Sequence, residues 1–177
     1  MYEKFLHNEE RVHINTENDL GYYFSFKNFT KQDYTLDEMV DTIIAFYKED
    51  WMTDDVFLEK IEYAYIDCGN DGNKELAIAI HTPWASQESW QEYLIIKNIN
   101  GTLQTVYSNV AWSRSRIQLN EYGCIFENGE GGAWNNSSDI SFIDAEGRWH
   151  NIENAEELTE DIKNGKDAEW QILDINN

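Results

Sequence analysis

The sequence predicts an α+β fold in which N-terminal helices pack on an antiparallel β-meander of about eight strands, followed by a short C-terminal helix. Apolar residues over 35–49 repeat with the period of a helix, and a period of two begins near Ile61. Hairpin turn signals then follow one another without an intervening helical pattern, which favours antiparallel pairing. We expect one domain over residues 1–177, with a helical portion (1–60), a meander (61–152) and a C-terminal helix and tail (153–177).

The N-terminal portion contains the clearest helix, from Thr35 to about Glu49. Thr35 and Glu38 have the spacing of a capping box, and the apolar residues that follow form one stripe, which we expect to pack on the sheet. A second short helix is predicted over Thr53–Lys60, with Thr53 as its N-cap. Before these helices, Tyr22–Phe26 is the one strand-like run.

The predicted strands pair as successive hairpins, and the Asn100-Gly101 turn is the strongest hairpin signal among them. The expected pairs are Ile61–Asp67 with Glu75–Thr82, Glu92–Asn98 with Leu103–Val110, Arg116–Leu119 with Gly123–Glu127, and Ile140–Asp144 with Arg148–Ile152. Asn154 is expected to cap a last helix over Ala155–Lys163, which ends at Gly165, and residues 169–175 to add an edge strand. The segments 83–91 and 127–139 are predicted to be loops that carry function.

The charge of the chain argues against two classes of partner. Thirteen Lys and Arg stand against 34 Asp and Glu, a formal net charge of −21, which repels nucleic-acid phosphates and anionic lipid. No apolar run approaches the roughly 18 residues of a membrane span, and the first ten residues do not form a secretory signal. The chain is therefore expected to be cytoplasmic, or extracytoplasmic if a signal was removed. The same charge suits a basic protein partner or a divalent cation.

The turn after the first predicted strand indicates cation chemistry. Calcium loops place oxygen ligands at alternate positions and a glycine at the sixth, because one short peptide must supply most of about 6 to 8 oxygens. Asp67, Asp71 and Glu75 occupy positions one, five and nine, and Asn70 is a further oxygen donor. The third position is Gly69 and the twelfth is not acidic, which excludes an intact EF-hand. The alternative is a turn whose Asp and Asn side chains bond their own backbone.

This segment resembles the Asp-x-Asp-Gly-Asp-Gly-x-x-Glu-Leu segments of uncharacterised secreted or lipid-anchored proteins from Gram-positive anaerobes. It is also similar to the loops of integrin-type propeller repeats. The resemblance implies calcium binding at Asp67, Asp71 and Glu75, with Gly72 in the turn, and a location outside the cell. A second stretch, Ile143–Trp149, is similar to the hairpins of tryptophan-glycine repeat proteins and implies a hairpin there.

Two further groups of residues are candidates for ligand binding. Tryptophan faces stack on sugar rings, and the tryptophans near predicted strand ends or loops are Trp84, Trp90, Trp112 and Trp134. Core packing is the alternative for all of them. Arg114 and Arg116 form the one local basic spot, which suits an anion or a carboxylate, with intramolecular salt bridges as the alternative.

No motif assigns an enzymatic activity. The sequence has neither a His-Glu-x-x-His nor a Gly-x-Ser-x-Gly, and Cys68 and Cys124 are expected to be buried thiols, with a cross-strand bridge as the alternative. The first hypothesis is therefore a non-enzymatic binding module for an unknown ligand such as a carbohydrate, with a structural cation. The second is an acidic immunity-type protein that masks a basic partner, and the third is a carboxylate-based hydrolase.

Overall fold

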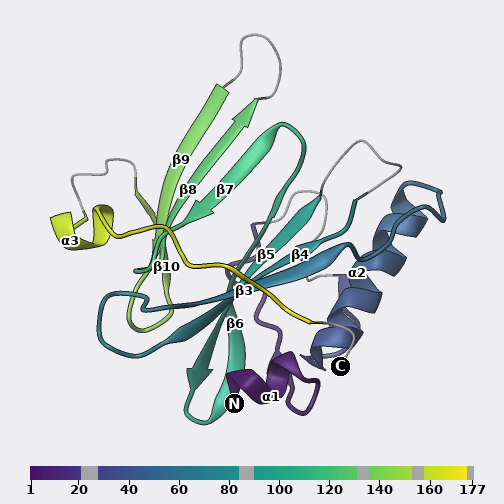
Figure 1. The fold of residues 1–177 in the computed structure, drawn as a ribbon, viewed down its shortest axis with the longest axis horizontal. Coiled ribbons are helices and arrows are strands. Elements are labelled where there is room, and N and C mark those ends of the chain that lie inside the picture. The colour runs from purple at the N-terminus through teal and green to yellow at the C-terminus, as the bar shows by residue number, and fades with distance from the viewer. Residues whose placement is uncertain (21–27, 84–89, 131–135, 153–157, 175–177) are drawn as a thin grey trace.

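The computed structural model describes residues 1–20, 28–83, 90–130, 136–152 and 158–174 (Figure 1). In these residues the chain is mixed α and β and mostly sheet, as the predicted class requires, with strands arranged in two sheets. The helices are α1 (Tyr2–Leu6), α2 (Leu36–Asp50) and α3 (Glu160–Lys163). The large sheet contains, in spatial order, β11 (Gln171–Ile172), β3 (Lys60–Ile66), β4 (Glu75–His81), β5 (Gln91–Ile99), β6 (Thr102–Ala111), β1 (Val12–His13) and β2 (Asp33–Tyr34). The small sheet contains β10 (Trp149–Ile152), β9 (Asn136–Ile143), β8 (Cys124–Glu130) and β7 (Ser115–Leu119).

Two sheets replace the single predicted meander. Strands β3 to β6 pair in sequence order, but β7 leaves the large sheet and begins the small one. The change occurs at a tight turn in which the Ser115 backbone N–H donates to the Trp112 carbonyl (2.7 Å) and the Ser115 hydroxyl accepts from the Trp112 N–H (2.9 Å). The predicted loop 127–139 is also shorter than expected, because β8 and β9 pair along most of it.

The N-terminal portion is less helical than predicted. Strands β1 and β2 add to the large sheet, and β1 pairs with β6 in parallel. Residues 53–59 are not helical, because the Thr53 hydroxyl accepts from the Asp55 N–H two residues on and the Glu59 N–H bonds the carbonyl of His81. Both bonds replace the helical ladder with local turn and sheet contacts. The strand-like run Tyr22–Phe26 lies outside the described residues.

Helix α2 covers one face of the large sheet (Figure 1). Thr35 caps it in a capping box with Glu38, and its buried stripe joins strand residues in one apolar cluster. The stripe is Leu36, Met39, Val40, Ile43 and Tyr47, and the strand residues include Ile61, Leu76, Ile78, Ile80, Leu94 and Ile96. Among the described residues, no helix is long and apolar enough to cross a membrane.

A second apolar cluster lies between the two sheets and joins them. Ile66 and Ile95 of the large sheet pack here with Leu119, Ile125 and Ile143 of the small one. The C-terminal segment then spans both sheets: the Ala168 N–H donates to the carbonyl of Leu119 (2.9 Å), and β11 pairs with β3.

The end of the chain differs from the prediction in length. Helix α3 begins at Glu160 with Thr159 as its N-cap, and β11 contains Gln171 and Ile172 only. The predicted cap Asn154 and the first residues of the predicted helix lie outside the described part of the chain.

Candidate functional site

The Asp67 turn uses its carboxylates to hold its own backbone. Asp67 is buried, and its oxygens accept from the N–H groups of Asp71 (2.9 Å) and Gly72 (3.0 and 3.1 Å). Asp71 in turn accepts from the Asn73 N–H (2.8 Å), and this backbone bond, followed by one from the Asn73 side chain, lowers the pKa of Asp71. Asn70 has a φ of 54°, the left-handed conformation that Asn tolerates in turns. These contacts are those of a self-bonded Asp and Asn turn.

Glu75 already has two partners at the base of the same turn. Its side chain is 1% exposed, accepts from the Cys68 N–H (2.8 Å) and forms an ion pair with the Lys97 ammonium. The negative charge that Glu75 would offer to a bound cation is therefore already neutralised by Lys97. Among the described residues, no group of three or more His, Cys, Asp and Glu side chains is arranged to hold a metal ion.

Gly69 occupies the calcium-loop position at which the sequence departs from the expected pattern. A Cβ on Gly69 would lie 2.5 Å from the backbone nitrogen of Ala145, and the residue has a φ of 79°. Glycine is therefore required because the turn packs against the β9–β10 connection. The Gly69 and Asp67 N–H groups donate to the carbonyls of Tyr122 and Glu121, which attaches this turn to the small sheet.

The tryptophans do not form one exposed platform among the described residues. Trp90 is 5% exposed and lies between Trp51 and Trp112, with ring centroids 5.1 and 6.4 Å away. Trp51 in turn stacks on Tyr47 of α2 at 4.3 Å. Trp90 is thus a core residue, and Trp112 is a half-buried member of this group of aromatic rings. Trp84 and Trp134 lie outside the described residues.

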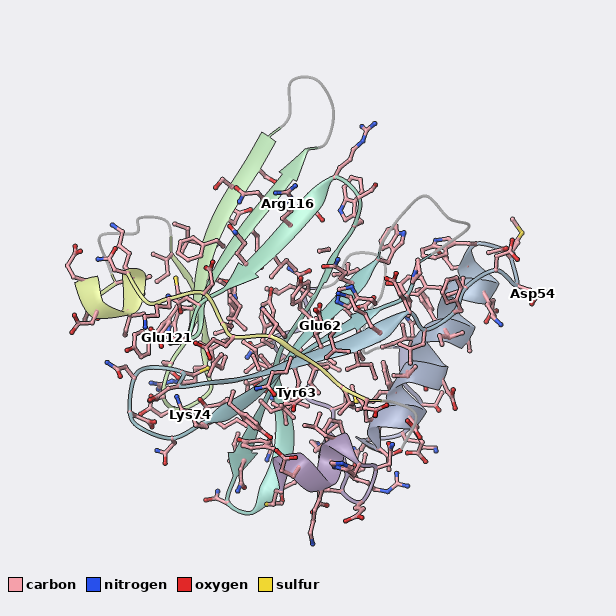
Figure 2. The ribbon with its side chains drawn as sticks, viewed as in Figure 1. Asp54, Glu62, Tyr63, Lys74, Arg116 and Glu121 are labelled. Atoms are coloured by element: carbon pink, nitrogen blue, oxygen red, sulfur yellow. The ribbon has the colours of Figure 1, made fainter. Side chains whose placement is uncertain are left out.

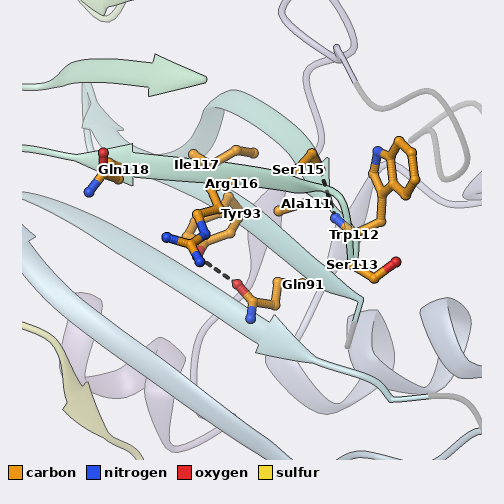
Figure 3. Close-up of a pocket in the computed structure, with 9 residues that line it drawn as sticks. All are labelled: Gln91, Tyr93, Ala111, Trp112, Ser113, Ser115, Arg116, Ile117 and Gln118. Atoms are coloured by element: carbon orange, nitrogen blue, oxygen red, sulfur yellow. Dashed lines mark hydrogen bonds between the residues drawn. The ribbon is translucent and has the colours of Figure 1, made fainter. Parts of the chain in front are cut away.

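The β6–β7 turn borders a hollow of about 380 Å³ between the large sheet and the edge of β7 (Figure 3). The group of aromatic rings supports the Trp112 side of this turn, and Ser115 closes it. Figure 3 shows Arg116 and Tyr93 extending from different strands toward the same space. The lining residues are Gln91, Tyr93, Ala111, Trp112, Ser113, Ser115, Arg116, Ile117 and Gln118.

Hydrogen bonds orient the polar groups at the base of this hollow. The Tyr93 hydroxyl donates to Gln91 Oε1 (2.8 Å), and the pKa of Tyr93 is raised to about 12 by burial and by the nearby Glu62. Tyr93 therefore stays protonated at neutral pH and keeps this bond. With its oxygen occupied, the Gln91 amide retains its NH₂ group as a donor to a ligand.

Three polar residues of the large sheet, His81, Glu62 and Lys60, form a cluster next to Gln91. His81 is the cross-strand partner of Gln91, and its Nε2 lies 2.7 Å from Glu62 Oε2. Lys60 lies 3.0 Å from the other Glu62 oxygen. Burial, followed by the charge of Lys60, lowers the pKa of His81, so this imidazole is neutral at neutral pH. Glu62 is therefore engaged by its own neighbours.

A second hollow, of about 430 Å³, adjoins the first on the other side of Arg116. It shares Ser113, Ser115 and Arg116 with the first hollow and adds Arg114, Asn128, Gly129, Ser137 and Ser138. Among the lining residues whose side chains the structure describes, which do not include Glu130, none is Asp or Glu, although the chain contains 34 of them. Neither Arg114 nor Arg116 forms an ion pair with a described carboxylate, whereas Arg11 and Arg148 both do. Figure 2 shows Arg116 on the small sheet, well apart from the other labelled cation, Lys74.

The structure thus brings together three of the predicted ligand-binding residues, Trp112, Arg114 and Arg116, and separates Trp90 from the surface. Sequence reasoning missed the neutral residues that complete the hollows: Gln91, Tyr93, Ser113, Ser115, Gln118, Asn128, Ser137 and Ser138. The available signal was the density of Ser around the two arginines and in β9.

No protein-family model, curated protein or solved structure matches the chain.

Proposed function

We propose that this protein is a non-enzymatic binding module that holds a small, polar, negatively charged ligand at Arg116. The observation that carries the proposal is the distribution of charge: an acidic chain places two arginines and no described carboxylate around its paired hollows. A guanidinium group pairs with a carboxylate or phosphate through two parallel hydrogen bonds.

The first hollow has the size and composition of a small-molecule site. Its volume of about 380 Å³ lies within the range of roughly 300 to 1,000 Å³ that such sites occupy. Trp112 and Tyr93 supply aromatic surface, while Gln91, Ser115 and Gln118 supply hydrogen-bonding groups that fix a ligand's orientation. Glu62, whose charge reaches Tyr93, is paired with Lys60 and lies beside His81. Acidic groups farther than about 10 Å from the site are screened by salt at 0.1 M ionic strength.

The proposal is tested by titrating ¹⁵N-labelled protein with citrate, inorganic phosphate and galacturonate, with neutral galactose for comparison. We expect at least one anion to shift the amide resonances of residues lining the first hollow, and galactose to bind more weakly than galacturonate. Arg116→Gln is expected to reduce the affinity about 10- to 100-fold, the effect of losing a charged hydrogen-bond partner. Lys74→Gln removes the same charge from an exposed residue of the β3–β4 turn and serves as the matched control. The proposal is overturned if no anion shifts these resonances, or if Arg116→Gln binds as the wild type does.

A further inference from the structure

The two hollows form a continuous path around the start of β7. Ser113, Ser115 and Arg116 line both of them, so a ligand that contacts Arg116 in the first hollow borders the second as well. Each hollow alone is large enough for one small molecule. A ligand with a single binding unit would leave the second hollow and Arg114 without contact.

The strand register explains how the second hollow is kept open. Arg116, Asn128 and Ser138 are cross-strand partners on β7, β8 and β9, and so are Ser115, Gly129 and Ser137. Neighbouring strands lie about 4.8 Å apart. Apart from Arg116 and Gly129, the two rows consist of short polar side chains, those of Asn128, Ser138, Ser115 and Ser137. A Cβ on Gly129 would approach Ser137 Oγ to 3.3 Å and Ser115 Cβ to 3.7 Å. Glycine at this position therefore leaves space between the two serines.

The chemistry of the lining selects among extended anionic ligands. Hydroxyl and amide side chains both donate and accept hydrogen bonds, which matches sugar hydroxyls, groups that also do both. An acidic peptide offers side-chain carboxylates, which only accept, and one N–H and one C=O per backbone residue, whereas each sugar hydroxyl both donates and accepts. Arg114 and Arg116, two positions apart, can each pair with a carboxylate when the ligand repeats its carboxylates along its length.

We propose that the ligand is an acidic oligosaccharide of at least two uronate residues, which crosses the β6–β7 turn and occupies both hollows. This inference rests on the proposed function and deepens it. One uronate carboxylate pairs with Arg116, and its ring lies beside Tyr93 and Trp112. The next residue places its carboxylate at Arg114 and its hydroxyls near Asn128 and Ser138.

The test is calorimetric titration of the full chain, free of divalent cations, with mono-, di- and trigalacturonate and with hexaglutamate. Affinity is expected to rise at least about tenfold from the monomer to the dimer or trimer, because the second unit binds without a separate association step. Arg114→Gln is expected to remove most of this gain, so that mono-, di- and trigalacturonate bind it with similar affinity, whereas Arg116→Gln weakens every ligand. Lys74→Gln should bind each ligand as the wild type does.

Each contrary result has a distinct meaning. If the monomer binds and longer ligands bind no more tightly, or if Arg114→Gln retains the gain with length, the inference is overturned and the proposed function stands. Hexaglutamate binding as tightly as trigalacturonate overturns the assignment to carbohydrate. If neither these ligands nor citrate and phosphate bind, both proposals fail.

Discussion

The Asp67–Glu75 turn and the Trp112–Arg116 turn differ in how their charged side chains are used. Both are polar turns that leave a strand of the large sheet, and both contain residues with the chemistry of a binding site. In the first, the carboxylates bond the turn's own N–H groups and Lys97, so their hydrogen-bonding capacity is used within the fold. In the second, two guanidinium groups lie in hollows lined by neutral side chains. The difference teaches that a charged residue indicates a binding site only where no other residue of the fold neutralises its charge.

The largest effect is expected from breaking the Glu75–Lys97 pair. Glu75→Leu leaves the Lys97 ammonium and the Cys68 N–H without their acceptor in a site where Glu75 is 1% and Lys97 13% exposed. Removal of one partner of a buried pair costs about 3–5 kcal/mol of unfolding free energy. Urea unfolding measures it, and the double variant Glu75→Leu/Lys97→Met should recover much of the loss. A single variant as stable as the wild type would show that this turn does not depend on its ion pair.

A second test concerns Glu92, a buried carboxyl of β5 that accepts a hydrogen bond from the Tyr47 hydroxyl. Burial, partly opposed by the bond from Tyr47, raises its pKa from 4.5 to about 8. The folded state therefore keeps this proton while the unfolded state loses it, so stability contributed by the neutral form declines as pH rises from about 4.5 to about 8. Between about pH 5.5 and about pH 7.5 the decline is about 3 kcal/mol at roughly 1.4 kcal/mol per unit.

Glu92→Gln is expected to remove this contribution and to flatten the pH dependence of the unfolding free energy relative to the wild type. Equilibrium unfolding at several pH values in this range measures the difference between the two proteins. Parallel curves would mean that Glu92 titrates in the fold as it does in the unfolded chain. The control is Asp71→Asn, an exposed carboxyl whose pKa is lowered, which should leave the slope in this range unchanged.

The smallest effect is expected from calcium. Because Asp67 and Glu75 already bond backbone N–H groups and Lys97, millimolar calcium should produce no binding heat at this turn and should shift the melting temperature by less than about 1 °C. Calorimetry and thermal unfolding with calcium and with EDTA test this directly. A calcium-dependent rise in melting temperature that disappears in Asp71→Ala would support a cation at this turn. It would also show that the carboxylates of this turn are not used only within the fold.

Much of the sheet could be predicted because strand periodicity and turn chemistry are local. The Asn100-Gly101 turn has positive φ at both residues, 53° and 86°, as a tight hairpin of this type requires. The division into two sheets could not be predicted, because alternation along a strand does not specify which neighbour pairs with it. The parallel pairing of β1 with β6 joins residues far apart in the sequence, and no local pattern records it.

The candidate site was predictable to a similar degree. Arg114 and Arg116 could be identified because basic residues are few in the sequence, and their separation by one residue places them in the same turn. The neutral groups of β5, β8 and β9 reach the same hollows only through the register of two sheets. The cation prediction at Asp67 lacked a ligand at the third loop position, which is Gly69. A side chain at Gly69 would collide with Ala145 in the β9–β10 connection, and this contact between distant parts of the sequence could not be predicted.

The two outermost strands of the large sheet, β2 and β11, contain only two residues each. An exposed sheet edge offers unpaired backbone groups to other chains, and short or charged edges limit that risk. Here β11 pairs with Glu62 and Tyr63 in the middle of β3, the uncovered start of β3 carries the charge of Lys60, and Asp33 lies on the opposite edge. Together with a net charge of −21, these short and charged edges disfavour self-association of the protein through the large sheet.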